Sequence, residues 1–214
     1  MTSPVKERQQ LDTQRFGDDV LRKVLSVTCN VPPPIYAPSD DSLLMIEALA
    51  NLQVDRKKVL DMGTGSGILG LYCAMRGADV TATDIDELAT VEAGRAARRL
   101  GVQLKLLVSD LFSHVPDRFD LILFNPPYLP SKDCQDRTID GGPEGNVLTD
   151  RFLNDLPTHL DRGAQALLLL SSLNDPPSVQ LRHSNFQFST VARRSLFFEE
   201  LRVLRVRLRD ELAI

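Results

Sequence analysis

Cysteine and histidine are scarce in this sequence, and their placement argues against a metal centre or a disulfide framework. The chain of 214 residues contains three of each. The cysteines are odd in number and far apart, so neither a set of disulfides nor a Cys-x-x-Cys metal pair is indicated. The histidines are scattered and none lies near a motif, so we predict no metal site. These residues are Cys29, Cys73 and Cys134, and His114, His159 and His183.

An excess of positive charge and long apolar runs are also missing. Lys and Arg total 25 against 29 Asp and Glu, a net charge of −4, so the overall charge does not indicate a nucleic-acid or membrane partner. No apolar segment is long enough to span a bilayer, and the first residues lack the apolar run of a signal peptide. With 43% hydrophobic and 25% charged residues, the composition is ordinary for a globular protein. We therefore expect a cytoplasmic protein with one folded domain and no membrane partner.

Short apolar runs and helical patterns alternate along the chain from Lys57 onward. The apolar runs have the length of strands buried on both faces, and the segments between them carry apolar residues at helical spacing. This alternation predicts parallel strand–helix–strand units with right-handed crossovers, which build a doubly wound α/β sheet. The expected strands are 59–62, 80–83, 104–108, 121–124 and 166–170, and the expected helices between them are 68–75, 88–100 and 147–160.

The last part of the chain breaks this alternation. Residues 186–191 and 201–208 are both rich in β-forming side chains, and only a short loop around Ser195 separates them. That loop is too short for a helical crossover, so the two strands are predicted to pair antiparallel. The expected fold is therefore a seven-stranded sheet that is mostly parallel and ends in an antiparallel hairpin.

The first 34 residues differ from the rest of the chain. They are polar and charged, show one short helical pattern at 18–27, and end in three prolines at 32–34 that indicate a stiff connector. We predict an N-terminal extension with one short helix that lies on the main body. A further helical pattern follows it, with Ser39 or Asp40 as the expected N-cap.

A glycine-rich turn follows the first expected strand and precedes a helix. Gly63, Gly65 and Gly67 let the backbone turn tightly and let a ligand approach the exposed N–H groups of the helix start. Residues 65–70 also satisfy Gly-x-Gly-x-x-Gly, a pattern that is typical of nicotinamide dinucleotide sites. However, Asp61 ends the strand directly before the glycines. A carboxylate there would repel a pyrophosphate, whereas it can pair with an ammonium group such as that of S-adenosylmethionine (SAM).

Two more carboxylates end the next two expected strands. Asp84 can accept hydrogen bonds from ribose hydroxyls, a role that NAD and SAM sites share. Asp110 can accept one from the amino group of adenine, and Leu111 beside it can pack on the ring. Together the three acidic strand ends predict a pocket for an adenosine. The plainer alternative is that they only cap strand–helix turns.

The most specific stretch of the chain is Asn125-Pro126-Pro127-Tyr128, at the end of the fourth expected strand. The side-chain oxygen of Asn125 and the carbonyl of Pro126 can accept hydrogen bonds from one NH2 group, while Tyr128 offers a flat face to a planar amide or base. Such a clamp would orient the nitrogen and stabilise the positive charge that develops on it during methyl transfer. The alternative is a proline-terminated strand without chemistry.

At this point the sequence resembles a known family. The motifs DMGTGSG (61–67), TDID (83–86), SDLF (109–112) and NPPY (125–128), in this order and spacing, resemble those of class I SAM-dependent methyltransferases that act on planar NH2 groups. Within this class the sequence most resembles the HemK-type glutamine methyltransferases, which modify the GGQ glutamine of class I peptide-release factors. Residues 36–42 match Tyr-x-Pro-x-(Glu/Asp)-Asp-(Ser/Thr), a pattern of the archaeal and eukaryotic branch.

The resemblance implies a methyltransferase domain at 35–214, SAM as the cofactor, S-adenosylhomocysteine as its product and a release factor as the protein substrate. It also implies a possible small zinc-binding activator subunit. Tyr36 and Pro38 are expected to cover the pocket. The implied catalytic residues are Asn125, Pro126, Pro127 and Tyr128, and the implied cofactor-binding residues are Asp41, Ser42, Asp61, Gly63, Gly65, Gly67, Asp84, Ile85, Asp110, Leu111 and Asn125.

Two departures from the family pattern concern the substrate more than the reaction. Relatives usually have an aromatic residue before Asp140-Gly141-Gly142, where this chain has Thr138 and Ile139, and residues 1–34 have no counterpart in the pattern. Two alternatives therefore remain open: an N6-adenine or guanine-amine methyltransferase of RNA or DNA, and a SAM-binding scaffold without catalysis. The acidic overall charge and the lack of a target-recognition domain favour a protein substrate.

Overall fold

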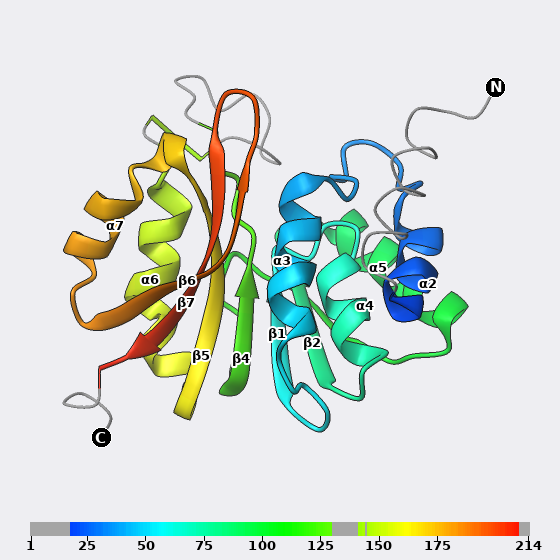
Figure 1. Cartoon of the computed structure of the whole chain (residues 1–214). Coiled ribbons are helices and arrows are strands. Elements are labelled where there is room, and N and C mark those ends of the chain that lie inside the picture. Colours follow the sequence, from blue (N-terminus) through cyan, green and yellow to red (C-terminus); the bar gives the residue numbers. More distant parts are fainter. Residues whose placement is uncertain (1–17, 130–140, 144, 210–214) are drawn as a thin grey trace.

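The structure, a computed structural model, describes residues 18–129, 141–143 and 145–209. These residues form one seven-stranded sheet in the order β3-β2-β1-β4-β5-β7-β6. Strands β1 to β5 run parallel, and β7 pairs antiparallel with both β5 and β6 (Figure 1). The predicted doubly wound sheet with a C-terminal antiparallel hairpin is thus confirmed. The strands are β1 (Lys58–Met62), β2 (Asp79–Asp84), β3 (Lys105–Val108), β4 (Phe119–Phe124), β5 (Leu160–Ser171), β6 (Phe186–Ser195) and β7 (Glu200–Leu208).

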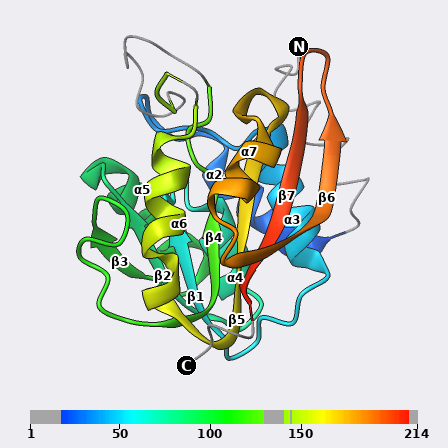
Figure 2. The ribbon, with the colours of Figure 1, turned by 90° about the vertical axis from the view of Figure 1, so that its left-hand side faces the viewer.

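Helices cover both faces of the sheet. One face carries α3 (Asp40–Ala50), α4 (Ile68–Ala74) and α5 (Glu87–Leu100), with α2 (Asp19–Thr28) packed outside α4 and α5. The other face carries α6 (Val147–His159) and α7 (Pro176–Arg182), which lie in front of the sheet in Figure 2. A buried apolar cluster fills the space on each side. None of the described helices is long and apolar enough to cross a membrane.

Strand β1 illustrates why a strand that is buried on both faces can be recognised in the sequence. Val59 belongs to the apolar cluster under α4, and Leu60 and Met62 belong to the cluster under α6. Side chains alternate between the faces of a strand, so Asp61 must point to the same side as Val59. Because both faces are buried, the strand reads as a continuous apolar run, which is why it was predictable.

The N-terminal helix α2 lies against the main body, in agreement with its helical pattern. Asp18 caps it by accepting hydrogen bonds from the N–H groups of Val20 at 2.8 Å and Leu21 at 3.1 Å. Its second carboxylate oxygen accepts the hydroxyl of Tyr72 on α4 at 2.6 Å. Residues 1–17 lie outside the described part of the chain, so the extent of the extension and the domain boundary after residue 34 stay predictions.

The structure differs from the predicted elements in several places, among them β4, which begins at Phe119 rather than Leu121, and β6, which continues to Ser195 rather than ending at Val191. Strand β5 begins at Leu160 rather than Ala166, because the added residues 161–163 are polar and hide the strand pattern. The short η1 (Ser172–Asn174) and α7 were not predicted. Helix α7 has seven residues, starts with two prolines and buries only Pro176 and Val179, so no apolar period marks it. The N-cap of α3 is Ser39, one of the two candidates.

Candidate active site

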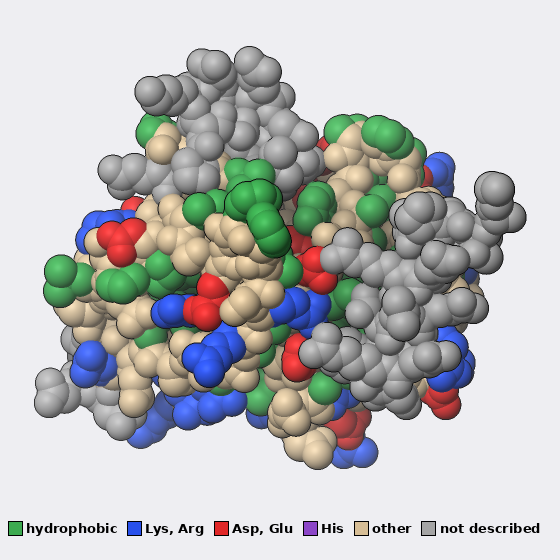
Figure 3. Space-filling model, turned by 45° about the horizontal axis from the view of Figure 1, so that its top comes forward, with side chains coloured by type: hydrophobic (Ala, Val, Ile, Leu, Met, Phe, Trp, Pro, Cys, Tyr) green, Lys and Arg blue, Asp and Glu red, His purple; other side chains and the backbone are tan. Residues whose placement is uncertain are grey.

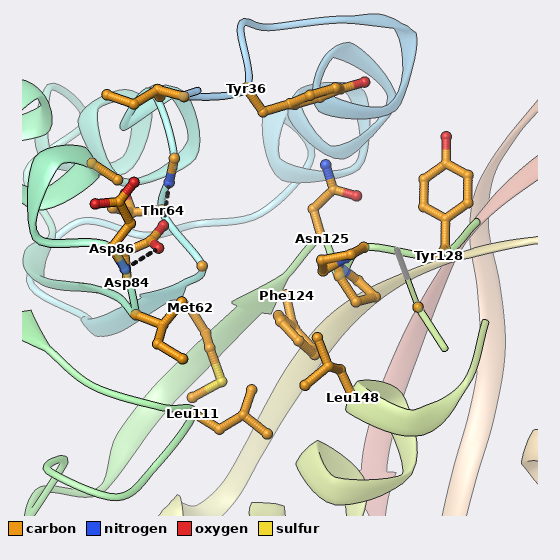
Figure 4. A pocket seen from close by; sticks show the side chains of 18 of the residues that line it. Tyr36, Met62, Thr64, Asp84, Asp86, Leu111, Phe124, Asn125, Tyr128 and Leu148 are labelled. Atoms are coloured by element: carbon orange, nitrogen blue, oxygen red, sulfur yellow. Dashed lines mark hydrogen bonds between the residues drawn. The ribbon is translucent and has the colours of Figure 1, made fainter. Parts of the chain in front are cut away.

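A cavity of about 1060 Å³ opens at the carboxyl ends of the parallel strands, where α/β sheets bind ligands. Figure 4 shows its lining: Asp84 and Thr64 lie at one end, Asn125 and Tyr128 at the other, and Tyr36 on the side toward α3. Pro38 is not part of the lining. The predicted site residues that line the cavity are Asp41, Ser42, Gly63, Gly65, Asp84, Ile85, Asp110, Leu111, Asn125, Pro126, Pro127 and Tyr128.

Asp84 holds the glycine-rich turn in place. One of its carboxylate oxygens accepts the N–H of Gly65 at 2.9 Å, and the other accepts the N–H of Asp86 at 3.0 Å. Burial raises the pKa of Asp84, while these backbone hydrogen bonds work in the opposite direction. Each oxygen accepts one backbone hydrogen bond and keeps a lone pair for a ligand. Binding of a ribose by Asp84 stays a prediction.

Asp61 and Gly67, which were both predicted to bind the cofactor, do not line the cavity. The side chain of Asp61 points to α4, where one oxygen accepts the hydroxyl of Thr64 at 2.6 Å and the N–H of Gly70 at 2.9 Å. Burial raises the pKa of Asp61 to about 6, although both hydrogen bonds oppose the shift. Gly67 is the N-cap of α4 at φ +84°, and a Cβ there would lie 3.0 Å from that of Ala93. Both residues support the glycine-rich turn on the side away from the cavity. Their contact with a cofactor stays a prediction.

The floor of the cavity is apolar. Met62, Leu111, Phe124 and Leu148 face it from four different segments (Figure 4). Leu111 adopts φ +49°, a strained conformation for a leucine, and its carbonyl accepts the hydroxyl of Ser109 at 2.8 Å. This arrangement turns the Leu111 side chain onto the floor, where it can pack against a planar ring.

Helix α6 contributes residues to the cavity that the sequence motifs did not single out. Leu148 and Arg151 both line it, and the guanidinium of Arg151 pairs with the Asp110 carboxylate at 2.9 Å. The pairing occupies one oxygen of Asp110. In the sequence, the stretch 140–145 and residues 150–153 after it also resemble the family, but this resemblance assigned no site role to Leu148 or Arg151. Asp140, Glu144 and the departures at 138–139 lie outside the described residues.

The acceptor end of the cavity contains a buried oxygen without a partner. Asn125 donates a hydrogen bond from Nδ2 to Oδ2 of Asp41 at 3.1 Å. The other oxygen of Asp41 accepts the N–H of Ser42 at 2.6 Å and its hydroxyl at 3.2 Å. These hydrogen bonds fix the orientation of the Asn125 amide. Its Oδ1 is buried and has no hydrogen-bond partner among the described residues. A buried acceptor left unpaired is costly, and a ligand NH2 group would satisfy it.

Tyr128 lies beside Asn125 in an acidic environment. Burial raises its pKa, and so do the negative charges of Asp41, Glu199 and Asp40. Tyr36 lines the same cavity, and burial together with Asp41 raises its pKa to about 12. Both phenols therefore stay neutral at ordinary pH. They can act as flat faces and hydrogen-bond partners but not as bases.

A buried residue that the sequence did not reveal fixes the loop of Tyr128. Asn174 in η1 donates from Nδ2 to the carbonyl of Tyr128 at 2.6 Å and to that of Gly145 at 3.2 Å. Its Oδ1 accepts the N–H of Ser171 at 3.0 Å. A Cβ on Gly145 would lie 2.4 Å from both Asn174 Nδ2 and Tyr128 O, so only glycine fits at this position. Asn174 thus joins the end of β5, the Asn-Pro-Pro-Tyr loop and the start of α6.

The described residues were predicted to contain no metal site. No group of three or more His, Cys, Asp or Glu side chains that could hold a metal ion occurs in the described part of the chain. Cys73 is buried in the core, and burial raises its pKa and that of Cys29, the latter to about 11. Cys134 lies outside the described residues.

Comparison with known proteins identifies the same region. Residues 39–141 match the model of the family described as "Methyltransferase small domain". "Putative protein N5-glutamine methyltransferase MJ0928" of Methanocaldococcus jannaschii is 34% identical over 191 residues, which cover 85% of this chain and 96% of that protein. A "Release factor glutamine methyltransferase" of Bordetella pertussis is 37% identical over 108 residues, 48% of this chain and 40% of that protein. The chain thus spans well under two thirds of this bacterial relative.

Other comparisons show both the fold and an alternative substrate class. The E. cuniculi Mtq2–Trm112 complex, described as responsible for the methylation of the eRF1 translation termination factor, is similar with a TM-score of 0.69 and 25% identity. That match covers 82% of this chain and 99% of the matched one. A "Ribosomal RNA small subunit methyltransferase C" of Alcanivorax borkumensis is 28% identical over 77% of this chain and 47% of that protein. From the identity and nearly complete coverage of the archaeal relative, the chain belongs to the protein N5-glutamine methyltransferase family and is a methyltransferase.

Proposed function

We propose that this protein transfers a methyl group from SAM to the side-chain amide of a glutamine in a class I peptide-release factor. The observation that carries the proposal is the buried Oδ1 of Asn125, an amide held through its Nδ2 by Asp41, for which no described residue supplies a hydrogen-bond donor. The names of the relatives that match the chain point to the same substrate class. The proposal implies that the protein acts in the cytoplasm, where translation ends.

The cavity fits SAM in size and in the chemistry of its walls. Its volume of about 1060 Å³ is at the upper end for a small-molecule site, which leaves room for an acceptor side chain beside the donor. Asp84 would accept the ribose hydroxyls, Asp110 the adenine amino group, and Leu111 would pack on the adenine. Asp41 and Ser42 would lie toward the methionine end. When bound, SAM supplies a methyl group on a positively charged sulfur.

At the acceptor end, Asn125 and the loop that follows it would hold the substrate amide. Asn125 Oδ1 and the carbonyl of Pro126 accept the two hydrogens of the NH2 group, which keeps the nitrogen lone pair directed toward the donor. Tyr128 covers the plane of the amide. The two oxygens also stabilise the positive charge that develops on nitrogen, and such preorganised contacts contribute most in the transition state. Because the phenols of Tyr36 and Tyr128 are neutral, the negative charge close to the amide comes from carboxylates.

The proposal is tested by methyl transfer from labelled SAM to purified release factor, with 16S ribosomal RNA assayed in parallel. We expect label in the factor, located by mass spectrometry on the glutamine of its GGQ sequence, and none in a factor with Gln→Asn at that position. Label in the RNA alone would replace this function by the amine methylation of a base. Binding of SAM without transfer to either substrate would leave a scaffold protein.

A small activator subunit is a further part of the proposal. The similar Mtq2 structure is a complex with Trm112, so we propose that a comparable zinc-binding partner joins this chain. We expect that a chain produced with such a partner has higher solubility and tighter SAM binding than the chain alone. Equal solubility and equal SAM affinity in both preparations would contradict the need for a partner.

A further inference from the structure

Two phenylalanines stand out at the tip of the C-terminal hairpin. Phe197 and Phe198 lie between β6 and β7 and are 93% and 87% exposed. Their rings pack edge to face with centroids 4.7 Å apart. The tip reaches the top of the molecule in Figure 1, the edge at which the parallel strands end and the cavity opens. Adjacent aromatic side chains exposed to this degree mark interaction sites more often than single surface residues do.

The tip is anchored to the rest of the fold. The N–H of Leu196 donates to the carbonyl of Glu199 at 2.8 Å, which closes the turn around the two phenylalanines. The N–H of Glu200 donates to the hydroxyl of Ser172 at 3.0 Å, and the carboxylate of Glu199 accepts the hydroxyl of Ser171. The aromatic pair is therefore presented on a fixed turn, which lowers the entropy lost when a partner binds it.

The hydrogen bonds that hold the tip continue to the acceptor end of the cavity. Ser171, which holds Glu199, donates its N–H to Asn174, and Asn174 holds the carbonyl of Tyr128. The charge of Glu199 also acts on the phenol of Tyr128. Figure 4 shows Tyr128 at the end of the cavity that is remote from Asp84. The hairpin tip and the acceptor end of the cavity are therefore linked by hydrogen bonds through Ser171 and Asn174.

The charges around the tip favour a protein over a nucleic acid. The carboxylates whose charges act on Tyr128 are Asp41, Glu199 and Asp40. Two of the nearby arginines are engaged, because Arg194 pairs with Asp40 at 3.2 Å and Glu47 at 3.3 Å, and Arg202 pairs with Glu200 at 2.6 Å. Arg193 is exposed and makes no ion pair among the described residues, so one cation stands against these carboxylates. From above, hydrophobic side chains gather near the middle of this face with acidic ones beside them (Figure 3). Phosphate backbones need free cations, whereas protein interfaces are enriched in aromatic residues at their centre.

We propose that the tip formed by Phe197 and Phe198 is a docking element for the protein that carries the acceptor glutamine. The two rings would enter an apolar depression on that protein while its glutamine loop enters the cavity. This inference rests on the proposed function, because it adds a second contact to the same substrate. Such a contact would supply affinity for the folded substrate without taking part in methyl transfer.

The test compares two substrates: the complete release factor and a short peptide that contains only its GGQ sequence. The variant is the double substitution Phe197→Ser and Phe198→Ser. Leu181→Ser is the matched control, because Leu181 is an apolar residue 80% exposed on α7. We expect the double variant to lose about 30-fold or more in kcat/KM with the complete factor, mainly through KM, as for residues at the centre of an interface. With the peptide, and in SAM affinity, it should match the wild type, and Leu181→Ser should match it in all three.

Several results would overturn the inference. Equal kcat/KM of wild type and double variant with the complete factor would show that the tip does not dock the substrate. An equal loss with factor and peptide would show that the tip acts on the cavity instead. A wild-type dimer that the double substitution converts to a monomer, at unchanged kcat/KM, would assign the tip to a second copy of this chain. If the wild type methylates neither substrate while binding SAM, the proposed function fails and this inference fails with it.

Discussion

The two ends of the cavity are built differently. At the donor end, the carboxylates of Asp61 and Asp84 already accept hydrogen bonds from the protein's own backbone and from Thr64. At the acceptor end, the buried oxygen of Asn125 has no hydrogen-bond partner in the described part of the chain. The donor end is held in its shape without a ligand, whereas the acceptor end is complete only when a substrate amide is present.

This difference bears on how substitutions at the two ends should act. A change at the donor end disturbs hydrogen bonds within the protein, so it should alter stability and SAM affinity together. A change at Asn125 removes the oxygen that the substrate amide would use and one hydrogen bond to Asp41, so it should alter the rate far more than the SAM affinity. The Asn-Pro-Pro-Tyr loop is held by hydrogen bonds from Asn174 to the carbonyls of Tyr128 and Gly145. We therefore expect a substitution of Asn174 to lower the stability of the fold most.

Asn174→Ala should have the largest effect on stability. It leaves the carbonyls of Tyr128 and Gly145 and the N–H of Ser171 without their buried partner. Each unsatisfied buried group costs about 1–3 kcal/mol, so the free energy of unfolding should fall by about 3 kcal/mol or more. Denaturant unfolding measures this, with Asn51→Ala at an exposed asparagine as a control that changes little. A loss below about 1 kcal/mol would contradict the role given to Asn174.

Asp61 should make stability depend on pH in a defined window. Burial raises its pKa from 3.8 to about 6, so the folded protein binds this proton more tightly than the unfolded chain does. The resulting stability is present below about pH 4 and is lost as the pH rises through about 6. At about 1.4 kcal/mol per pH unit, the loss is about 3 kcal/mol. The difference in unfolding free energy between wild type and Asp61→Asn should shift by this amount, and a difference that does not vary with pH would contradict the buried, strained carboxylate.

The same residue tests the predicted pairing with the ammonium group of SAM. Only ionised Asp61 attracts a cation, so the Kd for SAM should rise up to about tenfold per pH unit below about pH 6. In Asp61→Asn this part of the pH dependence should be absent, and the part that remains comes from other groups such as Asp84, whose pKa burial also raises. Calorimetry that gives the same profile for both proteins would assign Asp61 to the fold alone.

Gly70→Ala should lower the free energy of unfolding by a smaller amount. It tests how tightly α4 packs against the carboxylate of Asp61. The added Cβ would lie 2.9 Å from Oδ2 of Asp61, a buried carboxylate fixed by Thr64. Overpacking of this kind costs about 1–3 kcal/mol. Gly94→Ala in α5 is the matched control, because its Cβ would lie 2.7 Å from Cδ1 of Leu106 and 3.8 Å from Nη1 of Arg98, and both atoms end flexible side chains that can move. Equal stability of the two variants would contradict the rigid packing of Asp61.

Most of the fold could be predicted from the sequence because its pattern is local. Buried parallel strands read as apolar runs, and helices α4, α5 and α6 follow at the expected spacing. Helix α7 could not be predicted, because only Pro176 and Val179 of its seven residues are buried. The start of β5 was missed because the register with β4 shifts between Leu160 and Gln165, and the residues between them break the apolar run.

The site was predictable wherever its residues end a strand. Asp84, Asp110 and Asn125 follow apolar runs, and parallel strands bring such ends to one edge of the sheet. For Asp61 the prediction did not consider that side chains alternate between the two faces of a strand. Its side chain points to α4, and it does not line the cavity. Asn174 and Arg151 could not be found in this way, because tertiary packing across the sheet places them beside the cavity.

The kinetics of Asn125→Ala test the central claim most directly. The account predicts that kcat for the release factor falls by about 10²–10³-fold, because one preorganised contact to the developing charge is lost. The Kd for SAM should stay within roughly tenfold of the wild type, because the only donor-end contact that Asn125 is seen to make among the described residues is one hydrogen bond to Asp41. Asn125→Asp, which keeps the acceptor oxygen, should retain more activity than Asn125→Ala. Transfer at the wild-type rate by Asn125→Ala would contradict the amide clamp and leave only a fold that binds SAM.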